Sequence, residues 1–234
     1  EGYIFTEFIT PVSHAGKYNS ISCALGHHIY EGRWLHDQTY LDQAIWYWLL
    51  HDPYEPRPVF YKYSSWLSDA IYHRFLVNMD TSFITPLVPL LDQSYQSWEK
   101  QKQLPSGMYW QYDVRDGMEE SIGGSRHDKN VRPTINSYMF GNAVALAAMA
   151  KIVHIDSLAS EYPRKASALK MLVEKNLWNP KDLFFEVPEA KTGQLCGTRE
   201  EIGYIPLYFR LPDDSVIYAP AWDQLNDTAG FRAP

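Results

Sequence analysis

Cysteine and long apolar runs are almost absent from the sequence. Cys23 and Cys196 are the only two cysteines among 234 residues. Because disulfide scaffolds are usually dense in cysteine, we expect two free thiols rather than one disulfide. No run of about 18 apolar residues occurs, which is the shortest that a membrane-spanning helix needs, so we expect no membrane partner.

Basic residues are also scarce. Lys and Arg number 21 against 28 Asp and Glu, and the net charge is -7. Such a chain lacks the positive patch that phosphate backbones need, which argues against a nucleic-acid partner. The signatures of P-loop, dinucleotide and α/β-hydrolase sites are missing too. His27 and His28 lack metal-ligand spacing, so we expect no metal site and no cofactor.

Aromatic side chains, in contrast, make up 15% of the chain, with 8 Trp and 17 Tyr. Flat rings with a polar edge suit the faces of sugars, but large helical cores also contain many aromatic residues. Composition alone leaves both interpretations open.

Apolar residues recur with the helical period along most of the chain, which predicts an all-α protein. The predicted helices cover about 19–33, 37–51, 64–78, a segment from Asp80 past Trp98, 133–153, 156–177, 198–209 and 221–227. Short strands are expected only near Tyr109 and Phe184. Paired helices with short connections form either a bundle or a circular array of helical hairpins.

Two local signals refine these helices. Asp80 is placed to cap the fourth helix, whereas Pro86 and Pro89 should kink that helix or delay its start. Thr198–Glu201 has the spacing of a capping box, which predicts that a short helix opens there.

The helical period disappears between Gln103 and Arg132. Four carboxylates fall within eight residues of this stretch: Asp113, Asp116, Glu119 and Glu120. Glycoside cleavage needs one carboxylic acid to protonate the leaving oxygen and a second carboxylate to activate water or attack carbon. Crowded carboxylates repel one another, which keeps at least one protonated near neutral pH. The alternative is a solvated acidic loop, with or without a bound cation.

Arg126 and Arg132 follow these carboxylates. They could hold sugar hydroxyls or a sugar carboxylate, or they could pair with the loop carboxylates and fix the shape of the loop. The sequence leaves both roles open.

The segment Asp116-Gly117-Met118-Glu119-Glu120-Ser121 falls on the pattern Ser-Gly-(Leu/Met)-Asp-(Asp/Asn)-Ser. It resembles the acid-bearing loop of the six-hairpin glycoside hydrolases of family 63, which include processing α-glucosidases and mannosylglycerate hydrolases, and more distantly trehalases. Tyr63–Ala70 and Glu201–Tyr208 resemble two further segments of that family, in the same order. The resemblance implies that residues 1–234 are part of a single (α/α)6 catalytic domain with an active-site loop inserted at about 103–132. The seven or eight predicted helices are too few for six hairpins, so we expect a partial barrel.

The resemblance also implies an exo-acting, inverting glycosidase with a carbohydrate substrate. Glu119 takes the position of the general acid, one methylene longer than the Asp of the family, and Asp116 is the second catalytic candidate, with Glu120 as a competitor. The residues expected to bind the sugar are Tyr63, Trp66, Asp69, Trp110, Tyr112, Asp113, Arg126 and Arg132.

The catalytic base of that family lies beyond the point that corresponds to Pro234. We therefore expect a further segment or a second chain to complete the domain and supply the base, although Glu200 and Glu201 are candidates within the chain. The chain looks processed or excerpted, and a secreted or periplasmic location is favoured. Two other functions stay open: a non-catalytic carbohydrate-binding or scaffold domain of the same fold, and a polysaccharide lyase.

Overall fold

Helices dominate the computed structural model, which describes residues 5–15, 18–50, 61–117, 120–213 and 216–231. Within these residues, the β-strands form two short antiparallel pairs, near Tyr109 and Phe184 as predicted, and two isolated bridges join Gln103 to Tyr109 and Pro188 to Leu195. The chain divides into two compact units. The first comprises Glu1–Lys102 and Asn142–Arg164, and the second comprises Gln103–Gly141 and Lys165–Pro234.

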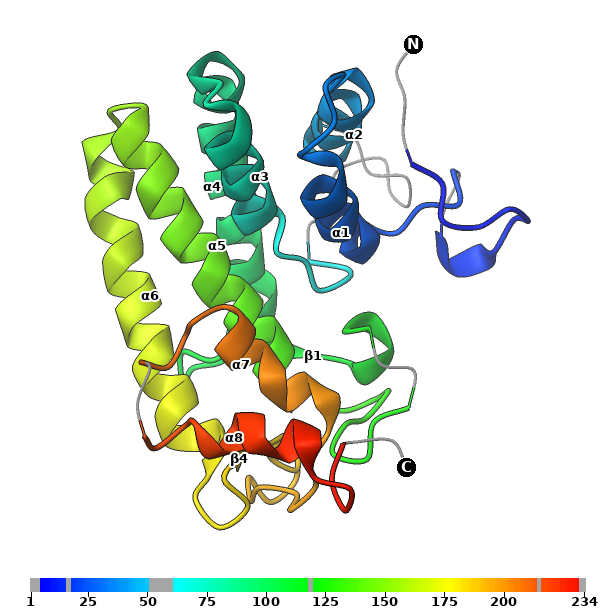
Figure 1. Cartoon of the computed structure of the whole chain (residues 1–234), viewed down its shortest axis with the longest axis vertical. Helices are drawn as coiled ribbons and strands as arrows, with labels where there is room; N and C mark the ends of the chain where they lie inside the picture. Colours follow the sequence, from blue (N-terminus) through cyan, green and yellow to red (C-terminus); the bar gives the residue numbers. More distant parts are fainter. Residues whose placement is uncertain (1–4, 16–17, 51–60, 118–119, 214–215, 232–234) are drawn as a thin grey trace. The chain divides into compact units, whose positions relative to one another are not determined.

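The first unit is built from α1 (Ser22–Gly32), α2 (Thr39–Leu50), α3 (Leu67–Asn78) and α4 (Thr81–Lys102), preceded by the short 3-10 turn η1 (Ser13–Ala15). Helix α1 packs on α2 and α3, and α4 packs on the same two helices (Figure 1). Apolar residues spaced three or four apart supply the contacts because that spacing places them on one helix face. The buried members include Leu25, Ile29, Leu41, Ile45, Ile71, Phe75, Leu87 and Leu91.

A buried cation joins α2 to α3. Arg74 of α3 is 1% exposed and donates hydrogen bonds to the carboxylate of Asp42 on α2 and, at 3.2 Å, to Gln38 Oε1. Its guanidinium also lies 3.9 Å from the centre of the Phe83 ring. Burial lowers the pKa of Arg74 and raises the pKa of Asp42, because both lose water on folding.

Helix α4 begins at Thr81, so Pro86 and Pro89 do not delay its start, and of the two predicted effects the kink stays a prediction. Asp80 caps the helix as predicted, with its Oδ1 accepting a hydrogen bond from Phe83 N at 3.1 Å. Both prolines lie on the exposed face of the helix. The carbonyl groups that lose their helical partner there can bind water instead, which explains why the helix tolerates them.

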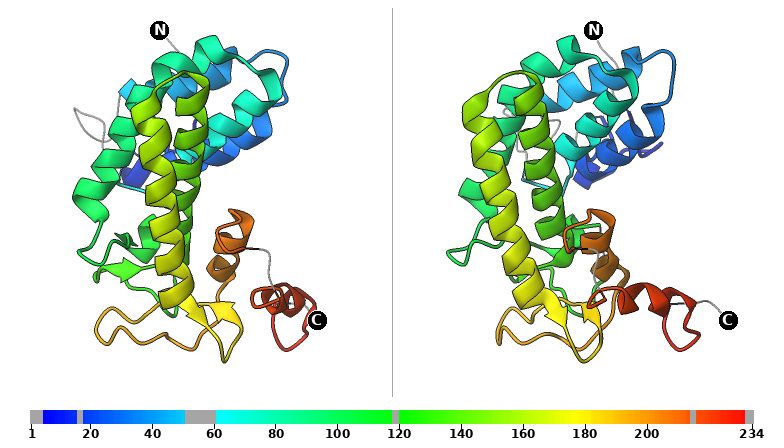
Figure 2. Two further views of the ribbon diagram at one scale, coloured as in Figure 1. Left: turned by 90° about the vertical axis from the view of Figure 1, so that its left-hand side faces the viewer. Right: turned by 60° about the vertical axis from the view of Figure 1, so that its left-hand side comes forward.

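Helices α5 (Pro133–Ile152) and α6 (Asp156–Leu177) each run from one unit into the other. They lie side by side in the two views of Figure 2. Their observed bounds agree with those expected from the sequence. None of the described helices combines the length and the apolar character that a bilayer span requires.

The second unit contains the strand pairs and the remaining short helices. β1 (Trp110–Gln111) pairs with β2 (Asn130–Val131), and β3 (Trp178–Asn179) pairs with β4 (Phe184–Phe185). The short helices are η2 (Asp113–Arg115), η3 (Glu201–Tyr204), α7 (Ile205–Tyr208), α8 (Pro220–Asp223) and η4 (Gln224–Asn226). Phe184, Tyr204 and Ala221 form a buried cluster that holds β4, η3 and α8 together, and Phe231 packs against it.

The predicted capping box at Thr198–Glu201 is wrong. Glu200 precedes η3, and no side-chain hydrogen bond caps that turn. The Glu200 carboxylate instead contacts a segment far away in the sequence, which local spacing cannot reveal. Cys23 and Cys196 are free thiols, as expected.

Candidate catalytic site

The acidic loop, residues 113–124, is anchored by a buried ion pair. Arg132 precedes α5, and its Nε donates a hydrogen bond to Asp116 Oδ2 at 2.6 Å, with both side chains 0% exposed. The hydroxyl of Thr134, in the first turn of α5, donates to the same oxygen. Both donors therefore fix the loop to the start of α5, and Asp116 Oδ2 serves them as an acceptor.

The strands that flank the loop are fixed at the same place. Asn136 of α5 accepts a hydrogen bond from Tyr109 N at 2.8 Å and donates to the carbonyl of Tyr109 at 2.9 Å. Its amide also donates to the carbonyl of Arg132 at 2.8 Å. One buried amide thus holds β1 and the residue before α5 in register.

Glu200 holds the far end of the acidic loop. Its Oε1 accepts from Ile122 N at 3.0 Å and its Oε2 from Gly123 N at 3.2 Å. The Ser121 hydroxyl lies 3.0 Å from each of the two oxygens. Two backbone amides and one hydroxyl therefore converge on one carboxylate.

Gly123 and Gly124 of this loop are required by close packing. A Cβ atom on Gly124 would lie 2.4 Å from Arg132 Nη1, and one on Gly123 would lie 2.8 Å from Cys196 Sγ. Real side chains do not approach so closely, so any other residue would push the loop away from Arg132. Arg132 Nη1 meanwhile donates to Ser121 Oγ at 3.3 Å, which joins the two ends of the loop.

Aromatic and basic side chains lie beside the acidic loop. Trp110 and Tyr112 form an edge-to-face pair with ring centres 5.2 Å apart. Lys129 Nζ lies 5.1 Å from the Trp110 ring, and Arg115 lies 5.6 Å from the Tyr112 ring. Asp113 is buried, and its Oδ1 accepts a hydrogen bond from Val114 N at 2.6 Å.

The structure describes Arg126 and Glu120 but not Glu119. Arg126 pairs with Glu120 at 3.0 Å, and both side chains are exposed. Glu119 lies outside the described residues. Its assignment as general acid therefore stays a prediction. Both Arg126 and Arg132 pair with loop carboxylates, which is the second of the two roles considered for them.

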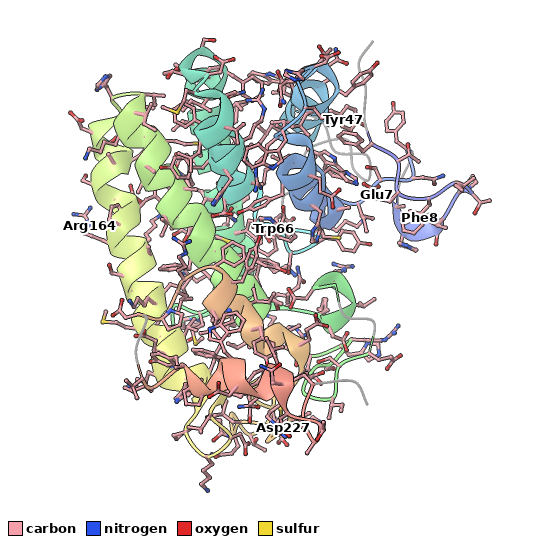
Figure 3. All side chains as sticks on the ribbon, in the orientation of Figure 1. Glu7, Phe8, Tyr47, Trp66, Arg164 and Asp227 are labelled. Carbon is pink, nitrogen blue, oxygen red and sulfur yellow. The ribbon has the colours of Figure 1, made fainter. Side chains whose placement is uncertain are left out.

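Tyr63, Trp66 and Asp69 belong to the first unit. Trp66, which Figure 3 labels, is 7% exposed. Its ring lies against Gly26 of α1 and forms an edge-to-face pair with the His27 ring, with the ring centres 4.7 Å apart. Tyr63 donates a hydrogen bond to the carbonyl of His14 at 3.1 Å. The histidine and Trp66 thus pack together, in line with a structural role for His27.

Asp69 belongs to a polar cluster on α3. Tyr30 donates a hydrogen bond to Asp69 Oδ2 at 2.7 Å, and His73 Nδ1 lies 3.3 Å from the same oxygen. The hydrogen bond with Asp69 raises the pKa of His73. Asn142 accepts from the backbone N–H of Asp69 at 3.2 Å, which fixes the start of α3 to α5.

The family assignment follows from the sequence comparison. Residues 17–234 match the family described as the mannosylglycerate hydrolase MGH1-like glycoside hydrolase domain. The chain belongs to this family. The resemblance read from the acidic loop is thereby confirmed at the level of the family.

Solved structures extend the MGH1-like assignment to the fold. A crystal structure of a GH63 mannosylglycerate hydrolase from Thermus thermophilus matches 89% of the chain with a TM-score of 0.75 at 12% identity, and the match covers 71% of that protein. A structure named "Sialidase" matches all of the chain with a TM-score of 0.94 at 47% identity, but the match covers 21% of that protein. The MGH1-like chain thus has the fold of part of a six-hairpin hydrolase, as expected.

One curated relative is much longer than this chain. An uncharacterized protein of Borreliella burgdorferi is 23% identical over 170 residues, which is 73% of this chain and 34% of that protein. The MGH1-like chain therefore spans about a third of this relative and 21% of the sialidase structure. Whether residues 1–234 belong to a single catalytic domain stays a prediction.

One buried carboxyl group of the MGH1-like chain was missed by the sequence reasoning. Glu186 is 1% exposed, and it accepts hydrogen bonds from Asn179 Nδ2 at 3.0 Å and Gly197 N at 2.9 Å. Burial raises its pKa from 4.5 to about 7. The available signal was a lone Glu inside the apolar strand segment 183–187. In the part of the chain that the structure describes, no group of His, Cys, Asp and Glu could hold a metal ion.

Proposed function

We propose that this chain supplies the acid half of the catalytic centre of an exo-acting, inverting glycoside hydrolase, with Glu119 as the general acid. The observation that carries the proposal is the buried Arg132–Asp116 pair, which fixes the backbone three residues before Glu119. A general acid must be held at a set place beside the leaving oxygen, so the loop that bears it needs such an anchor.

Asp116 is assigned a positioning role. Its Oδ2 accepts hydrogen bonds from Arg132 and Thr134, and a carboxylate that accepts two bonds in a buried site is suited to hold its neighbours in place. We assign the role of proton donor to Glu119, as the family resemblance implies, with Glu120 as its competitor. Asp113 is a second candidate to orient it.

The reaction adds water across the glycosidic bond. The Glu119 carboxyl group gives its proton to the glycosidic oxygen as the bond from that oxygen to the anomeric carbon breaks. A base on the opposite side of the sugar takes a proton from water, and the resulting hydroxyl group bonds to the anomeric carbon with inversion. Carboxyl groups about 6.5–9.5 Å apart leave room for that water.

The sugar site combines aromatic and polar side chains. Trp110 and Tyr112 form an aromatic pair beside the acidic loop, and Arg126 has an exposed donor group. The prediction from the sequence that Tyr63, Trp66 and Asp69 also contact the sugar is kept as part of this proposal. Arg132 has no exposed surface, so we assign it to the support of the loop rather than to the sugar.

The base is proposed to lie outside residues 1–234. The chain spans only part of its relatives, and both oxygens of Glu200 are occupied by loop donors. A continuation of the chain or a second chain would supply the missing carboxylate and the rest of the sugar pocket. The names of the matched structures suggest two substrate classes to include in a screen, mannosylglycerate and sialosides.

The first prediction tests the acid directly. In the intact protein, Glu119→Gln should lower kcat about 10²- to 10⁴-fold on a glycoside found in a screen of aryl glycosides, because general acid catalysis is worth that much. The loss should be much smaller on a substrate whose leaving group needs no proton, such as a glycosyl fluoride. NMR of the first-formed product should show the inverted anomer.

Glu120→Gln is the matched comparison, because Glu120 is the neighbouring carboxylate and pairs with Arg126 at the surface. If Glu120→Gln shows the larger loss, the acid is Glu120 and the assignment of Glu119 is wrong. Binding of sugars without any turnover by the intact protein would favour the non-catalytic alternative.

A further inference from the structure

We propose that Glu200 is a positioning residue for the general acid, because it clamps the stretch of the acidic loop that follows Glu119. The inference rests on the function proposed above. It gives a role to a carboxylate that the sequence offered as a candidate catalytic base.

The contacts of Glu200 are unusual for a residue at the start of a helical turn. Its carboxylate turns away from η3 and accepts the amide hydrogens of Ile122 and Gly123, residues that lie 78 and 77 positions earlier in the chain. Hydrogen bonds to a carboxylate are about twice as strong as neutral ones. The Glu200 side chain therefore holds this end of the loop, which forms no helix or strand.

The contacts of Glu200 are connected through Ser121 to the buried Arg132–Asp116 ion pair. Ser121 Oγ donates to Glu200 and lies 3.3 Å from Arg132 Nη1, which donates to it. Arg132 also donates to Asp116. The two ends of the segment between Asp116 and Ser121 are thus tied to one connected set of side chains.

The proposed acid lies between these two fixed points in the sequence. Glu119 follows Asp116 by three residues and precedes Ser121 by two. Contacts that order the flanking residues meet part of the entropy cost of ordering the loop before substrate binds. Because a misplacement of about 1 Å can cost about 100-fold in rate, a clamp on this segment acts on kcat more than on substrate affinity.

The contacts of Glu200 also differ from those that a catalytic base needs. Each oxygen of the carboxylate already accepts a backbone N–H, and the Ser121 hydroxyl lies within reach of both. A base must instead present an oxygen to the attacking water. Glu200 therefore acts on the reaction through the loop.

Glu200→Gln in the intact protein tests the clamp with two readouts. Glutamine has the same shape, but it loses the negative charge and turns an NH₂ group toward the loop donors. Hydrogen exchange at the amides of Ile122 and Gly123 should become at least about tenfold faster, because a bond to a charged acceptor is lost. With an aryl glycoside, kcat should fall about 10- to 100-fold while KM stays within about twofold.

Glu189→Gln is the control, because Glu189 is exposed and its side chain accepts a hydrogen bond from Thr192 of its own turn. It should leave both readouts unchanged. Ser121→Ala provides a second test that keeps the Glu200 carboxylate. It should give a smaller fall in kcat, since the two backbone amides stay bound.

Three results would overturn the proposal. Unchanged exchange and unchanged kcat in Glu200→Gln would show that the clamp has no effect. A loss of kcat with unchanged exchange would make Glu200 a group that acts on substrate. Faster exchange in a protein that cleaves no glycoside would support the clamp as a structural contact but remove its catalytic role, and with it the proposed function.

Discussion

Arg132 and Glu186 are both buried in the second unit, but their surroundings differ. Arg132 lies against the carboxylate of Asp116, so its charge is compensated. Glu186 accepts hydrogen bonds from the amide of Asn179 and the backbone N–H of Gly197, neither of which carries a charge, and its ionisable neighbour is the acidic side chain of Asp182. Burial, together with the interaction with Asp182, favours the neutral form of Glu186 and raises its pKa to about 7.

This difference predicts a pH dependence of stability. The pKa of Glu186 rises from 4.5 to about 7 on folding, so its contribution is fully present below pH 4.5 and is lost as the pH rises to about 7. Glu186→Gln stays neutral at every pH. The free energy of unfolding should therefore fall less between pH 4.5 and pH 7 in this variant than in the unchanged protein.

Urea denaturation at a series of pH values measures the effect. Glu189→Gln, at an exposed position of the following turn, should retain the slope of the unchanged protein. Parallel curves for Glu186→Gln and the unchanged protein would contradict the argument.

At the scale of elements, local signals predicted those features whose causes are local. Helix α6 begins at Asp156 and ends at Leu177, as the periodicity indicated. Pro86 and Pro89 misled the prediction of α4 because the cost of a proline depends on whether the freed carbonyl groups face water. The capping box failed because no side-chain hydrogen bond caps η3, and Glu200, the residue before this turn, binds partners about 80 residues away.

The cap of α4 gives a prediction at this scale. Asp80 Oδ1 accepts from Phe83 N and from the Ser82 hydroxyl, and the second of these bonds is the main reason why the pKa of Asp80 is lowered. Asp80→Ala should destabilise the protein by about 1 kcal/mol, whereas Asp80→Asn, which retains an acceptor oxygen, should cost little. Thermal or urea unfolding of both variants compares them. An equal loss in the two variants would show that the cap is not the cause.

At the scale of the whole molecule, the sequence could predict the helical class and the place of the acidic loop but not how the loop is held. The anchor on Arg132 and the clamp on Glu200 depend on contacts between distant residues. The part of the chain that was predicted to carry the acid itself, Glu119, lies outside the described residues. The family assignment came from the loop motif and two short segments, which is enough to identify a fold but not a substrate.

The partial span of the relatives leads to a prediction about completeness. Large apolar side chains such as Ile217, Trp222 and Leu225 are exposed near the C-terminal end of the second unit. We expect a further segment that completes the domain to cover such side chains. Residues 1–234 alone should show no turnover of a glycoside that the intact protein cleaves, because the proposed base lies outside them.

Parallel assays of the two proteins against the same aryl glycosides test this expectation. Circular dichroism should first show that the shorter protein is helical, so that a lack of activity is not a lack of folding. Full turnover by residues 1–234 would show that the base lies within them.

The distance along the chain between the acidic loop and Glu200 has a consequence for biosynthesis. Ser121 leaves the ribosome 79 residues before the side chain that binds it. At about 5–20 residues per second, the loop spends several seconds without its clamp while Asp116, Arg132 and Thr134 are already made. A nascent chain thus passes through a stage in which the anchor can form and the far end of the loop is still loose. The loop reaches its final shape only when translation has passed Glu200, so maturation of the acid is tied to the synthesis of the second half of the chain.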